Sequence, residues 1–336
     1  MNQFAKSTLI KTAVVAALFP LILTACNKKE GAAAPAATAS AAATGAEDAT
    51  CATVKFADIG WTDITATTAL SSTVLEGLGY KAKATIASVP IAFAGLKKGQ
   101  IDAFLGYWSP SMTPIVEPFT KDKSITVLDK PNLVGAKYTL AVPKYAYDAG
   151  LKSFADIGKF TKELDGKIYG IEPGNDGNKL IADMITKDAF GLKSFKMVES
   201  SEAGMLTEVS RSVKDKKWIV FLGWAPHPMN VQQDIVYLSG GDDFFGPNYG
   251  EAKVYTVTSN DLAKRCPNVN KLVTNLEFNV GMENEVMLPI MDKKVPNEAA
   301  KEWLAKNPAA LDKWLDGVTT KDGQPGLAAV KKYLGV

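Results

Sequence analysis

Residues 53–79 read TVKFADIGWTDITATTALSSTVLEGLG, a strand pattern that gives way to a helix pattern after a Gly-Trp pair. Residues 53–59 are a short run of apolar and β-branched side chains, which is typical of a buried strand. Residues 65–78 are predicted to form a helix that ends at Gly79. A strand that leads directly into a helix is the building unit of α/β folds.

The same alternation of strand-like and helix-like stretches continues along the chain. We predict further strands at residues 83–89, 101–105, 138–142, 167–171, 196–199, 218–222 and 253–258. We predict further helices at residues 91–98, 178–190, 203–213, 268–277, 283–291 and 297–306. This alternation indicates an α/β fold with mostly parallel sheets, in which ligands bind beyond the carboxyl ends of the strands.

Three of the six tryptophans follow one local pattern at the end of a predicted strand. Each apolar run reaches a glycine, which relaxes the backbone, and then presents an indole ring: FADIGW ends at Trp61, FLGYW at Trp108 and FLGW at Trp224. One such tryptophan is more often a core residue or a cover over the sheet edge. Three at equivalent places predict rings that converge on one crevice. Core packing is predicted for Trp218, Trp303 and Trp314.

Converging aromatic rings have a specific chemical use. Their electron-rich faces attract a weakly hydrated cation such as quaternary ammonium, with about 2 kcal/mol for each desolvated contact. Three or four rings then supply roughly 6–8 kcal/mol of favourable free energy before the entropic and desolvation costs of binding are subtracted. A micromolar dissociation constant corresponds to about 8.2 kcal/mol, so the two energies are of the same size. Asp63 either caps the following helix or faces the crevice. In the crevice, its carboxylate would accept a hydrogen bond from a ligand hydroxyl, favour positive charge and repel a ligand carboxylate.

The loop at residues 172–178, EPGNDGN, is a second and weaker candidate for the site. It joins a predicted strand to a predicted helix, and a turn with a helix cap explains its Pro, Gly and Asn content without any ligand. Backbone amides at the start of a helix also bind anions or ligand oxygens, so a binding role is the alternative.

Composition excludes several classes of function. The 336 residues suggest two domains, and 46% hydrophobic with 22% charged residues indicate a soluble globular protein. Basic residues number 38 and acidic residues 36, and the difference is Lys6 and Lys11, which we expect to be removed. This balance argues against nucleic-acid binding. The only histidine, His227, lies between two prolines, and with three cysteines it gives no zinc spacing. We expect no metal, no cofactor and no catalysis.

The first fifty residues are predicted to be an export signal and a tether. The apolar run at residues 12–23 is too short to span a membrane comfortably but suits a secretory signal. It leads into Cys26 in a way that resembles the lipobox of bacterial lipoproteins, where the chain is cut before an acylated cysteine. A chance cysteine behind an ordinary signal is the alternative. We predict a lipoprotein signal peptide at 1–25, and a lipidated Cys26 with a flexible alanine-rich linker at 26–50.

Export also changes the interpretation of the other two cysteines. Outside the cytoplasm, Cys51 and Cys266 can oxidise. We predict that they form a disulfide, which would bring a late segment back to the start of the folded part. The loop-entropy model assigns such a bridge roughly 5 kcal/mol as an upper figure. Two separate buried thiols are the alternative.

Seven segments carry a likeness to a known family: GWTDITAT (60–67), FLG (104–106), AKYTL (136–140), GIEPGNDGN (170–178), FLGW (221–224), PHPM (226–229) and SGGDDFFGPNYG (239–250). With them the chain closely resembles the choline-binding proteins of bacterial ABC importers, within the wider glycine betaine and proline betaine binding family. The likeness runs over almost all of residues 52–335 and leaves out the alanine-rich linker.

The resemblance implies an α/β, two-lobed class II periplasmic binding protein fold with a hinge between the lobes. It implies choline as the ligand, an ABC permease in the inner membrane as the partner, and a monomer at the periplasmic or extracytoplasmic face. The family's aromatic box falls on Trp61, Trp108, Tyr138 and Trp224. The residues that hydrogen-bond the ligand hydroxyl in the family correspond to Asp63 and Asn175, and Asp176 is adjacent.

The expected lobes are discontinuous in the sequence. We predict lobe I at residues 51–120 and 240–336, and lobe II at 121–239. Glycine betaine, carnitine or acetylcholine binding on the same fold is the alternative function. An esterase acting on choline esters is a further alternative, against which the missing G-x-S-x-G motif and the proline-flanked His227 argue. A structural lipoprotein or a sensory ectodomain that transports no ligand is the last alternative function.

Overall fold

The computed structural model describes residue 47 and residues 49–336. The predicted signal peptide, the lipidated Cys26 and most of the linker lie outside these residues. In the described part of the chain, no helix combines the length and the apolar character that crossing a bilayer requires.

A mixed sheet of nine strands organises the described residues, in the order β2-β1-β3-β9-β4-β7-β5-β6, with β8 paired to β4. The strands are β1 (Thr53–Asp58), β2 (Lys81–Ile86), β3 (Ala103–Ser109), β4 (Ile125–Pro143), β5 (Lys167–Tyr169), β6 (Lys196–Val198), β7 (Phe221–Ala225), β8 (Ile235–Tyr237) and β9 (Glu251–Ser259).

Strand direction differs between the ends of this sheet and its middle. β1 runs parallel to β2 and β3, and β5 runs parallel to β6 and β7. The two long strands in between are antiparallel, β9 to β3 and β4 to β9, β7 and β8. The expectation of mostly parallel sheets is therefore right for the outer strands and wrong for the middle. Parallel neighbours need a helical crossover, whereas β4 and β9 reach their places without one.

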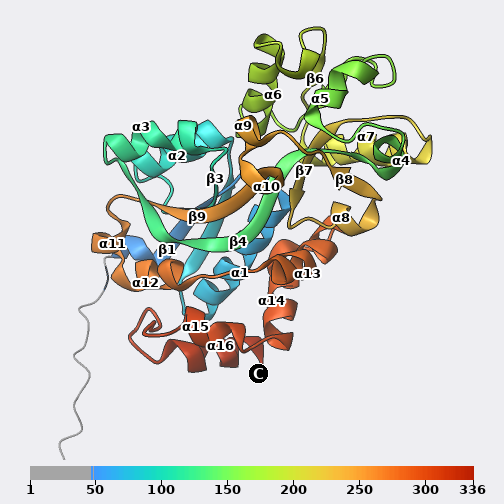
Figure 1. Cartoon of the computed structure of the whole chain (residues 1–336). Helices are drawn as coiled ribbons and strands as arrows, with labels where there is room; N and C mark the ends of the chain where they lie inside the picture. Colours follow the sequence, from blue (N-terminus) through green and yellow to red (C-terminus); the bar gives the residue numbers. More distant parts are fainter. Residues whose placement is uncertain (1–46, 48) are drawn as a thin grey trace, which may run out of the picture. The chain divides into compact units, whose positions relative to one another are not determined.

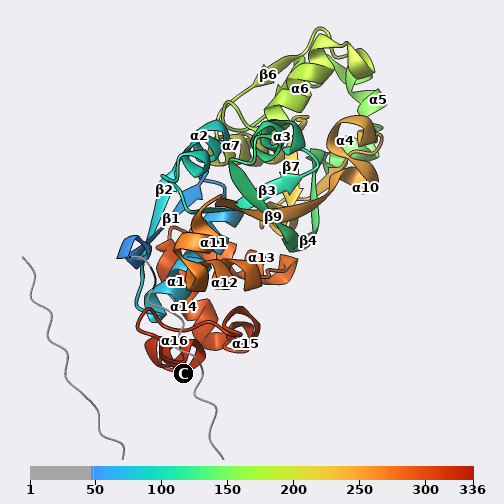
Figure 2. The same ribbon diagram turned by 90° about the vertical axis from the view of Figure 1, so that its left-hand side faces the viewer.

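The strand β4 links the two halves of the sheet. Its first part pairs with β9, at Ile125–Lys137, and its second part pairs with β7 and β8, up to Pro143. The register shifts repeatedly between residues 127 and 136, where the strand bends. In Figure 1, β1 and β3 lie on one side of this bend, and β6, β7 and β8 lie on the other; Figure 2 shows β2 beside β1. The boundaries at 120/121 and 239/240 stay predictions.

Helices cover both faces of the sheet. The longer ones are α1 (Thr62–Gly77), α2 (Val89–Lys97), α3 (Thr113–Lys121), α6 (Asp176–Thr186), α7 (Glu202–Lys214), α12 (Pro267–Asn275), α13 (Val280–Met291), α14 (Pro296–Lys306) and α16 (Gly326–Leu334). The shorter ones are α4 (Lys144–Asp148), α5 (Phe154–Ile157), α8 (Met229–Gln232), α9 (Asp242–Phe245), α10 (Pro247–Gly250), α11 (Leu262–Arg265) and α15 (Ala310–Trp314).

Helix α1 is buried along most of its length although it is rich in serine and threonine. Its hydroxyls donate to backbone carbonyls one turn earlier in the same helix: Ser71 to Thr67 at 2.8 Å, and Thr73 to Ala69 at 2.8 Å. These bonds satisfy the polar groups locally, so the helix can pack against α13, α14 and α16 without unpaired hydroxyls at these positions. The first turn of α1, which follows Trp61, is thereby held in the core.

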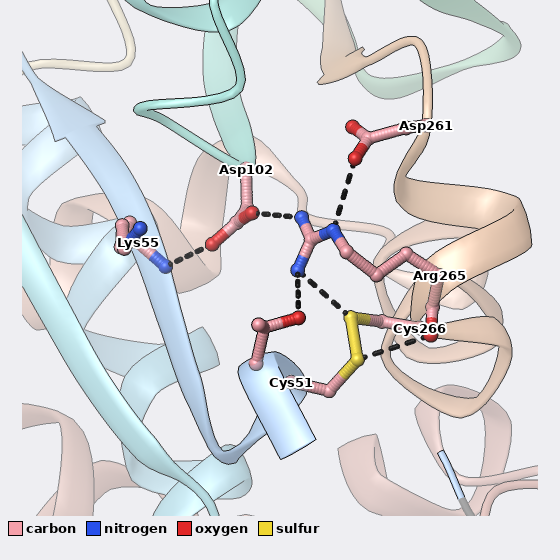
Figure 3. Close-up of polar contacts among 7 residues, drawn as sticks. Cys51, Lys55, Asp102, Asp261, Arg265 and Cys266 are labelled. Atoms are coloured by element: carbon pink, nitrogen blue, oxygen red, sulfur yellow. Dashed lines mark hydrogen bonds and ion pairs between the residues drawn. A yellow bond between two sulfur atoms is a disulfide. The ribbon is translucent and has the colours of Figure 1, made fainter. Parts of the chain in front are cut away.

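The predicted disulfide between Cys51 and Cys266 is confirmed, with a Cα–Cα distance of 5.6 Å. It lies beside an ion network that Figure 3 shows, in which the guanidinium of Arg265 is held between Asp102 and Asp261. Asp102 also accepts a hydrogen bond from the backbone amide of Lys55 at 2.8 Å. The start of β1 and the α11–α12 junction are therefore joined covalently and by charge.

Candidate functional site

One hollow brings together residues from the ends of β1, β3, β5 and β7, the starts of α1 and α6, and the interior of β4. Its volume is about 280 Å³ when the space at its open mouth is included. The lining residues are Trp61, Asp63, Trp108, Tyr138, Ile171, Asp176 and Trp224.

Six of the seven residues predicted for the site line this hollow, and Asn175 does not. The three strand-end tryptophans converge as their pattern predicted: Trp61 follows β1, Trp108 lies near the end of β3, and Trp224 lies near the end of β7. This agrees with the rule that ligands bind beyond the carboxyl ends of strands. Sequence reasoning missed Ile171, whose only signal is its place directly behind β5.

The other three tryptophans pack as predicted. Trp314 is 2% exposed, and its indole N–H donates to the carbonyl of Glu277 at 3.0 Å. Trp218 packs on the ring of Phe160, and Trp303 donates to the Glu285 carboxylate at 2.7 Å. None of the three lines the hollow.

Tyr138 is the centre of the aromatic group. Its ring centroid lies 6.0 Å from that of Trp108 and 6.4 Å from that of Trp224, in both cases edge to face. Tyr138 and Trp224 are direct partners in the pairing of β4 with β7, which places their side chains on the same face. The tyrosine hydroxyl lies so close to Gly177 that a Cβ there would be 2.0 Å away. Only a glycine leaves room for this ring.

The glycines before the tryptophans serve two different purposes. Gly60 has φ +86°, so its role is the backbone freedom that the sequence suggested. Gly106 and Gly223 lack a positive φ and are required by close packing. A Cβ at Gly106 would lie 2.6 Å from Ile64. The predicted relaxation of the backbone is therefore correct at Gly60 only.

Asp63 is the second residue of α1 and is 2% exposed. The capping position belongs to Trp61, so the interpretation of Asp63 as a helix cap is wrong. Its Oδ1 makes no hydrogen bond within the described residues, and neither do Oδ2 of Asp176, the hydroxyl of Tyr138 and the indole nitrogen of Trp108. An unpaired buried polar atom costs about 1–3 kcal/mol. Four such atoms on one hollow indicate a site built for a ligand with polar groups.

The hollow is strongly acidic. Burial first, and then the charges of Glu202 and Asp58, raise the pKa of Asp63 to about 8. Burial also raises the pKa of Asp176 to about 6, against a hydrogen bond from Ser111. Burial raises the pKa of Glu172 to about 7, while the hydrogen bond from Trp61 opposes the shift. None of the lining residues is basic. A cation would stabilise these carboxylates in their charged form.

Asn175 is the cap of helix α6. Its Oδ1 accepts from the backbone amide of Asn178 at 2.8 Å, and its amide donates to the carbonyl of Glu172. The interpretation of the loop at 172–178 as a turn with a helix cap is therefore correct. The cap also fixes Asp176, the next residue, against the hollow. Contact between Asn175 and a ligand stays a prediction.

His227 is engaged on both sides of its ring. Its Nδ1 accepts from the backbone amide of Met229 at 3.0 Å, and its Nε2 lies 3.2 Å from Oε1 of Glu202. The imidazole is 1% exposed and is not among the residues that line the hollow. A general base must reach the proton that it removes, so this geometry adds to the sequence argument against an esterase.

The sequence model of the family described as the substrate binding domain of ABC-type glycine betaine transport systems matches residues 52–306. The chain belongs to this family of two-lobed periplasmic binding proteins, which serve ABC importers outside the cytoplasm. Its members bind and deliver substrates; they are not known as enzymes.

Two similar solved structures refine this placement. An ABC-transporter choline binding protein in complex with choline is 54% identical, with a TM-score of 0.83, over 85% of this chain and 99% of that chain. A lactococcal OpuAC in its closed-liganded conformation with glycine betaine is 28% identical, with a TM-score of 0.70, over 78% and 98%.

A curated relative aligns over a shorter part of the chain. The glycine betaine/carnitine transport binding protein GbuC of Listeria monocytogenes is 32% identical over 169 residues, which is 50% of this chain and 54% of that protein. The chain therefore matches about half the length of this relative.

Proposed function

We propose that the chain is the choline receptor of an ABC importer, and that choline is bound in the hollow between Trp61, Trp108, Tyr138 and Trp224. The observation that carries the proposal is four aromatic rings and two buried carboxylates on one small hollow without a basic residue. Ring faces attract trimethylammonium, with about 2 kcal/mol for each desolvated contact. The 54% identity to a choline binding protein supports the same ligand.

The polar end of the ligand decides between choline and glycine betaine. Asp63 and Asp176 each present an unpaired oxygen to the hollow, and a hydroxyl can donate to such an oxygen. A ligand carboxylate at this place would meet like charge. Asn175, beside Asp176, completes the proposed set for the hydroxyl. These contacts favour choline over the other three ligands. Glycine betaine has a carboxylate and no hydroxyl, carnitine has a carboxylate besides its hydroxyl, and acetylcholine has an ester in place of the hydroxyl.

The remaining parts of the proposal concern the place of the protein. We infer a lipid anchor at Cys26 after removal of residues 1–25, with a linker at 26–50 that tethers a monomer to the membrane. Lobe I comprises residues 51–120 and 240–336, and lobe II residues 121–239. The partner is an ABC permease in the inner membrane, which receives the ligand. Mass spectrometry of the membrane-extracted protein, with Cys26→Ser as the control, tests the acylation.

Isothermal titration with choline, glycine betaine, carnitine and acetylcholine tests the ligand. We expect choline to bind most tightly. In the Asp63→Ala protein, choline should lose about 1.5–3 kcal/mol of binding free energy, and glycine betaine should lose little, because only choline donates to this carboxylate. Equal losses for both ligands would contradict the proposed specificity. No binding of any quaternary amine by the wild type would refute the function and favour a structural or sensory role.

A further inference from the structure

Glu202, the first residue of α7, holds the start of α1 although 140 residues separate the two. Its carboxylate accepts from the backbone amide of Thr62 at 2.9 Å and from the Thr62 hydroxyl. Thr62 stands between Trp61 and Asp63, which both line the hollow. Glu202 itself is 6% exposed and is not a lining residue. It can therefore act on the ligand only through its neighbours.

His227 is the third partner of the same carboxylate. The amide of Met229 donates to Nδ1 of the imidazole, so in the neutral ring the proton is on Nε2. This Nε2–H group points to Oε1 of Glu202 at 3.2 Å. His227 follows Trp224 by three residues, and the two rings are in contact, with centroids 5.1 Å apart. One carboxylate thus connects the segments that carry Trp61, Asp63 and Trp224.

A second carboxylate makes a parallel contact. Oε1 of Glu172 accepts from the indole nitrogen of Trp61 at 2.9 Å. With the proposed lobes, Trp61 and Thr62 belong to lobe I, whereas Glu172, Glu202 and His227 belong to lobe II. Two acidic side chains of one lobe therefore receive three hydrogen bonds from a single dipeptide of the other lobe. Such bonds exist only when the lobes are close together.

We propose that Glu202 is a positioning residue that fastens the closed lobes and so slows release of the ligand. This proposal rests on the proposed function of the hollow. Hydrogen bonds to an ionised acceptor are stronger than those between neutral groups. The clasp, as we call the contacts of Glu202 with Thr62 and His227, holds Trp61 and Asp63 opposite Trp224. Opening the lobes must break its bonds to Thr62, because these two donors and their acceptor lie in different lobes, whereas His227 stays with Glu202 in lobe II.

The test is the dissociation rate of choline, measured by stopped-flow tryptophan fluorescence. We expect Glu202→Ala to raise this rate by about ten- to a hundred-fold while the association rate changes much less. Glu202→Gln should be intermediate, because its one carbonyl oxygen can still accept from Thr62, but its amide meets the Nε2–H group of His227. Thr62→Val, which removes only the hydroxyl donor, should raise the rate by a few-fold.

Glu208→Gln is the matched control, since Glu208 lies on the same helix and pairs with Arg211 at the surface. It should leave the dissociation rate unchanged. A merely structural role of Glu202 would lower the unfolding temperature and leave the rates of the folded protein as they are. Unchanged dissociation in Glu202→Ala, Glu202→Gln and Thr62→Val would overturn the proposal.

Small-angle X-ray scattering separates this proposal from the proposed function. A clasp predicts a larger radius of gyration for ligand-free Glu202→Ala and Glu202→Gln than for the wild type and Glu208→Gln, whichever ligand the hollow takes. If the wild type binds no quaternary amine, the proposed function fails and the scattering difference alone decides on the clasp. Equal radii in all four proteins would refute the clasp even when choline binds.

Discussion

The acidic residues of the site carry an electrostatic cost that a cation can offset. Asp63, Glu172 and Asp176 all have a pKa above the usual range, and burial is the first cause in each case. The ring of Tyr138 and the missing Cβ of Gly177 show how closely the same hollow is packed. At the scale of single residues, the site therefore combines a fixed aromatic surface with carboxylates whose charge depends on the ligand.

Proton release follows from these pKa values. The pKa of Asp63 is about 8, so much of this carboxyl group is protonated at neutral pH. A bound cation stabilises the charged form and lowers the pKa, so binding expels protons and the affinity for choline rises as the pH increases from about 6 to about 8. Titration calorimetry in buffers of different ionisation enthalpy measures the released protons. Asp63→Asn should release fewer, and equal release in both proteins would contradict the assignment to Asp63.

At the scale of helices and strands, the elements around the site are held by two kinds of contact. Some join residues close together in the sequence, and others join residues far apart. The middle of α1 is held by the hydroxyls of Ser71 and Thr73, which donate to carbonyls one turn earlier in the same helix. The loop before α6 is fixed by the cap at Asn175. β1, β3 and α11 are fixed to one another by Asp102, which accepts from Lys55 and pairs with Arg265. The first two devices are local in the sequence, whereas the third depends on segments far apart.

Removing Asp102 should therefore be costly. Its side chain is 3% exposed, and Asp102→Ala leaves the half-buried Arg265 without its inner partner and the Lys55 amide without its acceptor. We expect a loss of about 3–5 kcal/mol in the free energy of unfolding, measured by urea denaturation. Asp261→Ala removes the outer, more exposed partner of Arg265 and should cost less than about 1 kcal/mol. Equal losses would show that burial does not set the strength of this network.

At the largest scale, the described residues share one bent sheet, and strands from both of its halves contribute to the hollow. Along β4 the chain passes from pairing with β9 to pairing with β7 and β8, and its late segment returns to β3 through β9 and to the start of β1 through the disulfide. In Figure 3 the disulfide lies among β1, the start of β3 and α11, and none of its residues lines the hollow. Closure at the hollow and anchoring at the disulfide thus involve different residues of the molecule.

Loss of the disulfide should separate stability from binding. A Cys51→Ser, Cys266→Ser double variant loses a cross-link over 215 residues. We expect it to lower the free energy of unfolding by about 2–5 kcal/mol. The dissociation constant for choline, measured by calorimetry below the unfolding transition, should stay within about two-fold of the wild type, because neither cysteine lines the hollow. A large loss of affinity in the folded variant would mean that the two regions are coupled.

Sequence alone determined the features that follow from local pattern. Alternating strands and helices gave the fold class, and strand-end tryptophans predicted a shared crevice because parallel strands end on the same side of a sheet. Tyr138 was found only through the family resemblance, because an aromatic residue inside a strand is ordinary packing. The first part of β4, at residues 125–137, and the strand β8 were missed, since residues such as Asp129, Pro131 and Gly135 interrupt the strand pattern.

Only the tertiary structure decided the direction of β4 and β9 and the partners of Glu202. Strand direction and the bonds of Glu202 to Thr62 and His227 join residues far apart in the chain, and no periodicity records such pairings. The pKa of Asp63 is likewise a property of burial and of neighbours from other segments. Local pattern therefore sets which side chains reach the hollow, and long-range packing sets their charge and the bonds that hold the lobes together.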